Sequence, residues 1–133
     1  MNAPASFDEA APARERLVVI GNGMAGCGAV EEILGRDASR CDITIFGAEP
    51  RVNYNRIMLS PVLAGEKRFE EIVINPQAWY DDNGITLVSG DPAEHIDREN
   101  RAVISRSGRV EPYDRLLIAT GSDPFIIPVP GSN

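Results

Sequence analysis

Three glycines with the spacing G-x-G-x-x-G lie near the start of the chain: Gly21, Gly23 and Gly26. They follow four consecutive apolar residues, 17–20, a run that is typical of a strand buried on both faces of a parallel sheet. In a turn from a strand into a helix, the first glycine permits the tight turn, the second leaves the backbone open to a pyrophosphate, and the third lets the helix pack closely on the strand. A helix that begins at Met24 and Ala25 points free N–H groups and the positive end of its dipole at the anion. These residue types at this spacing predict a turn that binds a pyrophosphate.

A pyrophosphate-binding turn of this kind also needs a helix, a second strand and an acidic residue about 20 positions further on. Residues 24–34 are helix formers with an apolar stripe, and Gly35 is expected to end the helix. Residues 42–46 predict the second strand. Glu49 follows that strand, 23 residues after Gly26, where its carboxylate can accept hydrogen bonds from a ribose. The pattern therefore predicts a dinucleotide-binding βαβ unit, with a tight turn that binds no ligand as the alternative.

Two arginines follow Glu49 in a polar loop, Arg51 and Arg56. A guanidinium matches the geometry of a phosphate, so these side chains could neutralise the phosphates of a dinucleotide. The alternative is that both are solvated charges on an acidic protein. The functional interpretation is favoured for Arg56 and less so for Arg51.

The later elements are expected to complete an α/β fold. Residues 57–63 predict a short helical piece that Pro61 begins or interrupts. A second helix is expected with Asn75 as its N-cap, Pro76 at its first position and Gly84 just past its end. A strand, a small antiparallel hairpin and a last strand should follow, at residues 85–88, 95–107 and 115–118.

Length and charge bound the class of protein. The 133 residues fit one domain, and a net charge of −7 argues against nucleic acid and anionic membrane surfaces as partners. No apolar run approaches the ~20 residues of a membrane span. The start of the chain lacks the pattern of a secretory signal, so a cytoplasmic location is expected. We expect a disordered tail at residues 1–15, a folded domain at 16–121 and a proline-rich extended tail at 122–133.

The sequence predicts neither a metal site nor a catalytic side chain. His95 has no His, Cys or carboxylate cluster at ligand spacing around it. Cys27 and Cys41 do not form a C-x-x-C pair, which argues against a disulfide reductase. Cys27 falls in the first turn of the phosphate-binding helix, where the dipole could lower its pKa, but packing against the sheet is the favoured interpretation. No residue is predicted as a general acid, base or nucleophile.

Several separated motifs, taken in order, resemble flavoproteins with two dinucleotide-binding domains. They are the glycine turn, E-P-R at 49–51, Y-N-R at 54–56 followed by L-S at 59–60, and Y-D-x-L-x-I-A-T-G at 113–121. Within that group, V-N-Y-N-R-I-M-L-S-P at 52–61 and A-T-G-S-x-P at 119–124 are the most telling. They resemble the N-terminal FAD-binding part of the NAD(P)H-dependent assimilatory nitrite reductase large subunit. The resemblance covers residues 16–131.

The resemblance implies FAD as the cofactor and gives roles to residues in each motif. The three glycines, with Met24 and Ala25, would face the FAD pyrophosphate. Glu49 would bind the adenosine ribose, and Arg56 would lie near the pyrophosphate or the edge of the flavin. The backbone of Ala93 would contact the adenine. Thr120 and Gly121 would pass close to the cofactor, because small residues let the backbone approach a ligand.

Two departures from related sequences qualify this expectation. Ferredoxin and rubredoxin reductases carry a lysine after the L-S pair, whereas this chain has Pro61, which makes electron delivery to small iron–sulfur proteins the less favoured assignment. The 133 residues also contain one glycine-rich fingerprint, so further domains or a partner chain are expected to supply the NAD(P)H and electron-acceptor sites. The chain is therefore expected to be inactive alone, as the first segment of a longer flavoprotein.

Three alternatives remain open. The chain could be the FAD-binding segment of a ferredoxin or rubredoxin reductase, a plain NAD-binding Rossmann domain, or a non-catalytic assembly module. The hairpin followed by A-T-G at 119–121 argues against the plain NAD-binding domain, because flavoproteins use this arrangement and simple dehydrogenases do not.

Overall fold

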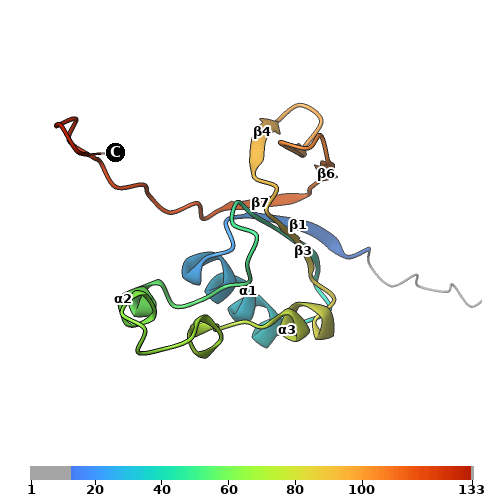
Figure 1. Ribbon diagram of the computed structural model, residues 1–133. Coiled ribbons are helices and arrows are strands. Elements are labelled where there is room, and N and C mark those ends of the chain that lie inside the picture. The colour runs from blue at the N-terminus through green and yellow to red at the C-terminus, as the bar shows by residue number, and fades with distance from the viewer. Residues whose placement is uncertain (1–12, 133) are drawn as a thin grey trace, which may run out of the picture.

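The computed structural model describes residues 13–132 of the chain. Four strands form one parallel sheet in the order β3-β2-β1-β7 (Figure 1). They are β1 (Glu15–Ile20), β2 (Cys41–Gly47), β3 (Thr86–Ser89) and β7 (Arg115–Ile118). Helix α1 (Met24–Asp37) connects β1 to its parallel neighbour β2. The predicted α/β fold with a βαβ start is confirmed.

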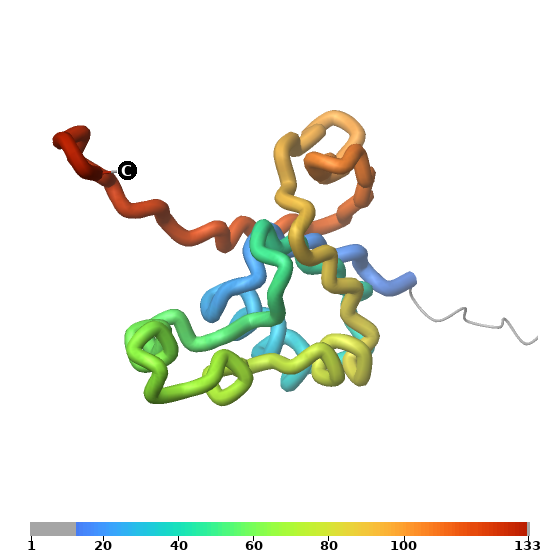
Figure 2. Tube along the Cα trace, in the orientation of Figure 1, coloured from blue at the N-terminus to red at the C-terminus, as the bar shows by residue number. Residues whose placement is uncertain are grey.

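The parallel sheet is covered on both faces. Helices α1 and α3 (Gln77–Asp82) lie on one side, and a small antiparallel sheet lies on the other (Figures 1 and 2). Side chains of β1 alternate between the two cores: Leu17 and Val19 pack with the helices, and Val18 and Ile20 pack with the small sheet. Burial of each such side chain contributes about 1.5–3 kcal/mol to folding, so β1 is the centre of the hydrophobic core.

Helix α1 is longer than predicted. It continues through Gly35 to Asp37, so the prediction that Gly35 ends the helix was wrong. The Asp37 side chain accepts hydrogen bonds from the backbone N–H of Ser39 at 3.0 Å and from its hydroxyl at 2.6 Å. This local turn competes with further helical hydrogen bonds and ends the helix at Asp37 instead.

The connection from β2 to β3 contains two 3₁₀ turns and two short helices: η1 (Arg56–Met58), α2 (Leu59–Leu63), η2 (Phe69–Ile72) and α3. The helical piece is confirmed, but Pro61 lies inside the first turn of α2, where its missing N–H costs no hydrogen bond.

The predicted N-cap of α3 was wrong by one residue. Pro76 is the N-cap, and the buried Asn75 side chain accepts from Asn53 Nδ2 and donates to Glu31 Oε1, both at 2.8 Å. These buried partners use the amide that would otherwise cap the helix. Gly84 follows the helix with φ of +65°, as predicted.

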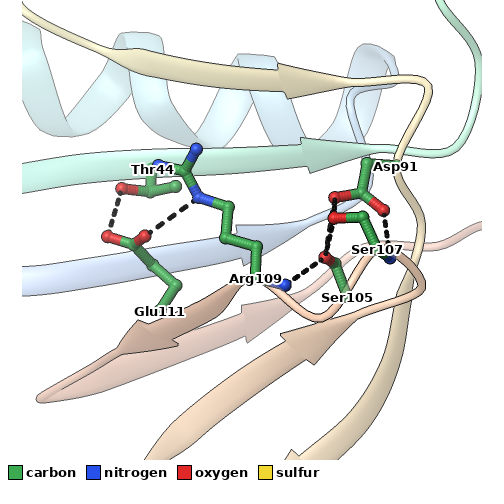
Figure 3. Close-up of polar contacts among 6 residues, drawn as sticks. All are labelled: Thr44, Asp91, Ser105, Ser107, Arg109 and Glu111. Carbon is green, nitrogen blue, oxygen red and sulfur yellow. Dashed lines mark hydrogen bonds and ion pairs between the residues drawn. The ribbon is translucent and has the colours of Figure 1, made fainter.

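The predicted hairpin is part of a three-stranded antiparallel sheet. Its strands are β4 (Ala93–Asp97), β5 (Ala102–Ser105) and β6 (Val110–Pro112), in that order. The third strand was missed because its three residues are too few to show a period. Glu111 on β6 accepts a hydrogen bond from Thr44 Oγ1 on β2 at 3.2 Å, which joins the small sheet to the parallel sheet (Figure 3).

The last strand is attached to the first by Arg16 and Asp114. The Arg16 guanidinium donates to both carboxylate oxygens of Asp114, at 3.0 and 3.1 Å, and its backbone N–H donates to Oδ2 at 2.7 Å. The hydrogen bonds from the Arg16 side chain are the largest cause that lowers the pKa of the Asp114 carboxyl, to about 2.

Asp114→Asn is therefore expected to lower the thermal midpoint at neutral pH and to flatten its fall on acidification. The carboxyl has a pKa of about 2 in the folded chain and ~3.9 when unfolded. Its contribution to the free energy of unfolding is therefore fully present above about pH 4 and is lost as the pH falls towards 2. Thermal unfolding followed by circular dichroism across this range measures the slope. Asp82→Asn, an exposed change on α3, is the control for removing a surface charge. An equal fall of the thermal midpoint with pH in the parent and in Asp114→Asn would contradict the prediction.

The expected disordered tail and the expected domain boundaries are not tested by the described residues. Residues 1–12 belong to the expected disordered tail and are not described, and the proposed domain boundaries stay predictions. Within residues 13–132, no helix has the length and apolar character needed to cross a membrane.

Candidate functional site

A cleft of about 750 Å³ lies beside the loops that follow β1, β2 and β7. Of the ten residues predicted for the site, all except Gly26 line this cleft. Residues from four separate segments of the chain meet here, because the carboxyl ends of parallel strands lie at the same edge of a sheet. In open α/β sheets, ligands bind at this edge. The volume is within the range of pockets that hold small molecules and cofactors.

The three glycines of the turn have different surroundings. Gly21 has φ of +116°, and a Cβ there would lie 2.1 Å from the carbonyl oxygen of Ala119, so only glycine fits between the two loops. A Cβ on Gly26 would lie 2.5 Å from the carbonyl oxygen of Gly21, which explains the close packing of α1 on β1. At Gly23 a Cβ would meet nothing within 4 Å. The second glycine thus leaves open space in the cleft, where a pyrophosphate would need it.

The N-terminus of α1 borders this open space. Gly23 is the N-cap, and no side chain of the described residues caps the helix. The N–H groups of the first turn therefore have no partner within the helix and can donate to an anion, and the helix dipole adds to the attraction. Backbone donors and room for a ligand occur together at Gly23, so the residues present fit a dinucleotide pyrophosphate.

Glu49, just beyond β2, is held by two neighbouring side chains. The Tyr54 hydroxyl donates to Glu49 Oε2 at 2.8 Å, and the Arg56 guanidinium pairs with Oε1. Partial burial alone would raise the pKa of Glu49, but the hydrogen bonds from Tyr54 and Arg56 outweigh it and hold the pKa below its usual value. Glu49 is therefore an ionised acceptor at neutral pH. The two residues predicted for the ribose and the phosphates contact one another directly.

Two further segments complete the walls of the cleft. After β7 the chain returns through Thr120 and Gly121, where Gly121 has φ of +72°. On the opposite side, Pro92 and Ala93 line the cleft at the start of β4. The turn before them is tied to the second loop, because the Gly90 N–H donates to the Glu49 carbonyl oxygen at 3.1 Å.

Asn22 is a residue of the cleft that sequence reasoning missed. Its Oδ1 accepts hydrogen bonds from the Tyr80 hydroxyl at 2.7 Å and from Cys27 Sγ at 3.1 Å, and its Nδ2 donates to the Arg51 carbonyl oxygen at 3.2 Å. Asn22 thereby joins the glycine turn to the loop after β2. Its place between two glycines was a weak signal, and nothing in the sequence pointed to Tyr80, which lies 58 positions away.

Cys27 is a packing residue, as predicted. It is 1% exposed, within the core between α1 and the parallel sheet. Burial raises the pKa of its thiol, opposite to the lowering that the helix dipole alone would cause. Within the described residues no three His, Cys, Asp or Glu side chains come together as metal ligands would.

The glycine turn, the α1 N-terminus and the strand-end cleft define a dinucleotide-binding α/β domain. Residues 15–133 match the family model described as pyridine nucleotide-disulphide oxidoreductase, and the chain belongs to that family. The family resemblance inferred from the motifs is confirmed, and FAD is the cofactor.

Individual relatives narrow the comparison. The chain is 48% identical over 120 residues to the NAD(P)H nitrite reductase of Bacillus subtilis, covering 90% of this chain and 15% of that protein. It is 47% identical over 120 residues to the assimilatory nitrate reductase electron transfer subunit of the same organism, covering 90% of this chain and 16% of that protein. Among solved structures, NADH:rubredoxin oxidoreductase from Clostridium acetobutylicum matches with a TM-score of 0.78 and 33% identity, covering 89% of this chain and 30% of the other. The chain spans about a sixth of the two Bacillus relatives.

Proposed function

We propose that this chain is the FAD-binding part of an NAD(P)H-dependent oxidoreductase of the nitrite reductase type. The observation that supports the proposal best is the cleft, where the open space at Gly23, the bare N-terminus of α1 and the ionised Glu49 meet. When bound, FAD supplies the redox chemistry, with NAD(P)H as hydride donor and an acceptor that takes electrons singly.

The chain's own residues bind and orient the cofactor in this proposal. The first turn of α1 donates hydrogen bonds to the pyrophosphate, and Glu49 accepts them from the adenosine ribose. Ala93 contacts the adenine through its backbone, while Thr120 and Gly121 let the chain pass close to the cofactor. Arg56 lines the cleft and keeps its pair with Glu49, and its guanidinium offsets the negative charge of the phosphates.

The nitrite reductase type is favoured over the ferredoxin and rubredoxin reductases for two reasons. Sequence identity is higher to the nitrite reductase than to the rubredoxin oxidoreductase over nearly the same part of the chain. Pro61 also stands where the latter type carries a lysine, so α2 has no ammonium group at that position. We place the protein in the cytoplasm, where a reducing environment keeps thiols such as those of Cys27 and Cys41 free.

The 133-residue chain alone is expected not to accelerate flavin reduction by NADH or NADPH. Hydride transfer needs nicotinamide and flavin held in near contact, which is a large part of the rate. The 133 residues contain one glycine-rich dinucleotide-binding motif, and it is assigned to FAD, which leaves none for NAD(P)H. Bleaching of flavin absorbance under anaerobic conditions, with free FAD in the same buffer as reference, measures the rate.

The control is the same chain grafted into the Bacillus subtilis nitrite reductase in place of its matching residues. We expect the graft to reduce its flavin rapidly with NAD(P)H, which shows that the segment is competent when the rest of the enzyme is present. Reduction by the 133 residues alone, faster than free FAD, would contradict the proposal, and a homodimer that supplies contacts in trans would give this result. A graft that binds FAD but is not reduced would contradict the nitrite reductase assignment.

A further inference from the structure

The wall of the cleft at Pro92 and Ala93 is built on an irregular piece of sheet. Ala93 is the first residue of β4 and pairs with Ser105 on β5. The register of this ladder shifts between Ala93 and His95, so regular pairing is interrupted next to the cleft. Strand pairing alone therefore holds Ala93 less firmly than a residue within a regular ladder.

Asp91 supplies contacts that the ladder lacks. Its Oδ2 accepts hydrogen bonds from the hydroxyls of Ser105 and Ser107, both at 2.6 Å, and its Oδ1 accepts from the Ser107 N–H at 2.9 Å (Figure 3). The Ser105 hydroxyl also accepts from the Arg109 N–H at 3.2 Å. Hydrogen bonds from Ser105 and Ser107 are the largest causes that lower the pKa of the Asp91 carboxyl, so it is ionised at neutral pH.

These contacts hold the two residues that bond the cleft wall: Ser105 is paired with Ala93, and Arg106 bonds Pro92. Ser105, which Asp91 holds, is the strand partner of Ala93. The next residue, Arg106, donates its N–H to the Pro92 carbonyl oxygen at 2.9 Å. Asp91 thus holds the β5–β6 turn against the segment that contains Pro92 and Ala93, and Gly90 ties that segment to Glu49 on its other side.

We propose that Asp91 is a positioning residue that holds the Ala93 backbone where it can recognise the adenine of FAD. The inference rests on the proposed function, in which Ala93 contacts the adenine. Asp91 does not line the cleft and is not proposed to touch the cofactor. It acts through Ser105 and Ser107, and it raises the preference of the cleft for adenine over other bases.

The same hairpin contains a matched control at its other end. Asp97 accepts hydrogen bonds from the Glu99 N–H at 3.1 Å, from the Asn100 N–H at 3.0 Å and from Asn100 Nδ2 at 2.8 Å. It is thus an aspartate with three local donors in the β4–β5 turn, and it does not line the cleft. Asp97→Ala removes similar contacts without affecting the cleft wall.

The test compares FAD with flavin hypoxanthine dinucleotide, which carries an oxygen in place of the adenine amino group. Dissociation constants from flavin fluorescence titration give a selectivity ratio for each variant of the full chain. The parent and Asp97→Ala should prefer FAD by about tenfold, the equivalent of one hydrogen bond. Asp91→Ala should prefer it by less than about twofold, because a displaced backbone no longer distinguishes the two bases.

Each outcome decides the matter. If Asp91→Ala keeps the parent's selectivity, or if Asp97→Ala loses it equally, Asp91 supports only the fold. If Asp91→Ala does not fold by circular dichroism, Ser107→Ala replaces it, and an unchanged ratio there overturns the inference. A parent that binds FAD without preferring it to the analogue overturns the inference about Asp91 and leaves the proposed function standing. A parent that binds neither dinucleotide overturns the proposed function as well.

Discussion

Gly23→Val is expected to abolish FAD binding while the chain stays folded. A β-branched side chain at this position would fill the space that the pyrophosphate needs at the N-terminus of α1. The protein itself tolerates the change, because a Cβ on Gly23 meets nothing within 4 Å and the backbone there is extended, with φ of −105° and ψ of −171°. We expect the dissociation constant from flavin fluorescence titration to rise by more than about a hundredfold, the equivalent of ~3 kcal/mol.

Gly28→Val is the matched control for this change. Gly28 lies within α1, the helix that Gly23 caps, a Cβ on Gly28 also meets nothing within 4 Å, and the residue does not line the cleft. We expect this variant to bind FAD as the parent does, with circular dichroism showing both variants folded. Equal FAD affinity in Gly23→Val and the parent would remove the glycine turn from the site.

Glu49→Ala should weaken FAD binding by one to two decades. A charge-assisted hydrogen bond contributes about 1.5–3 kcal/mol, and Glu49 is ionised because Tyr54 and Arg56 stabilise its carboxylate. The Arg56 side chain is 58% exposed, so it is free to return to water when its partner is removed. The loss should shrink sharply for FMN, which has no adenosine ribose.

Glu94→Ala provides a matched control for the loss of an exposed ion pair. Glu94 pairs with Arg106 at 2.8 Å, outside the residues that line the cleft. Exposed pairs of this kind contribute at most about 1 kcal/mol to stability, so this variant should bind both flavins as the parent does. A loss of the same size for FAD and FMN in Glu49→Ala would show that Glu49 supports the fold and does not bind the ribose.

The parts of the fold that could be predicted are those in which neighbouring residues fix the structure. The buried strand at 17–20, the glycine turn at 21–26 and the start of helix α1 at Met24 have patterns that each specify one local conformation. The location of the cleft could be predicted from this βαβ unit, because parallel strands bring the loops that follow them together at one edge of the sheet. Gly84 could be predicted for the same reason, since its φ of +65° is a local requirement.

The parts that could not be predicted depend on contacts between residues far apart in the sequence. The Asn22 side chain joins two loops through Tyr80 and Arg51, and no spacing in the sequence indicates that network. Asn75 looked like an N-cap because asparagine favours that position, but its amide bonds buried partners on other segments. The pairing of Arg56 with Glu49 likewise depends on how the second loop folds back on itself.

Titration of the purified chain with FAD, in the absence and presence of NAD⁺, tests most directly that this cleft is a flavin site. We expect saturable quenching of flavin fluorescence at about one FAD per chain, and displacement by NAD⁺ only at concentrations far above that of FAD. A chain that binds NAD⁺ more tightly than FAD, or that binds no FAD at all, would contradict the account.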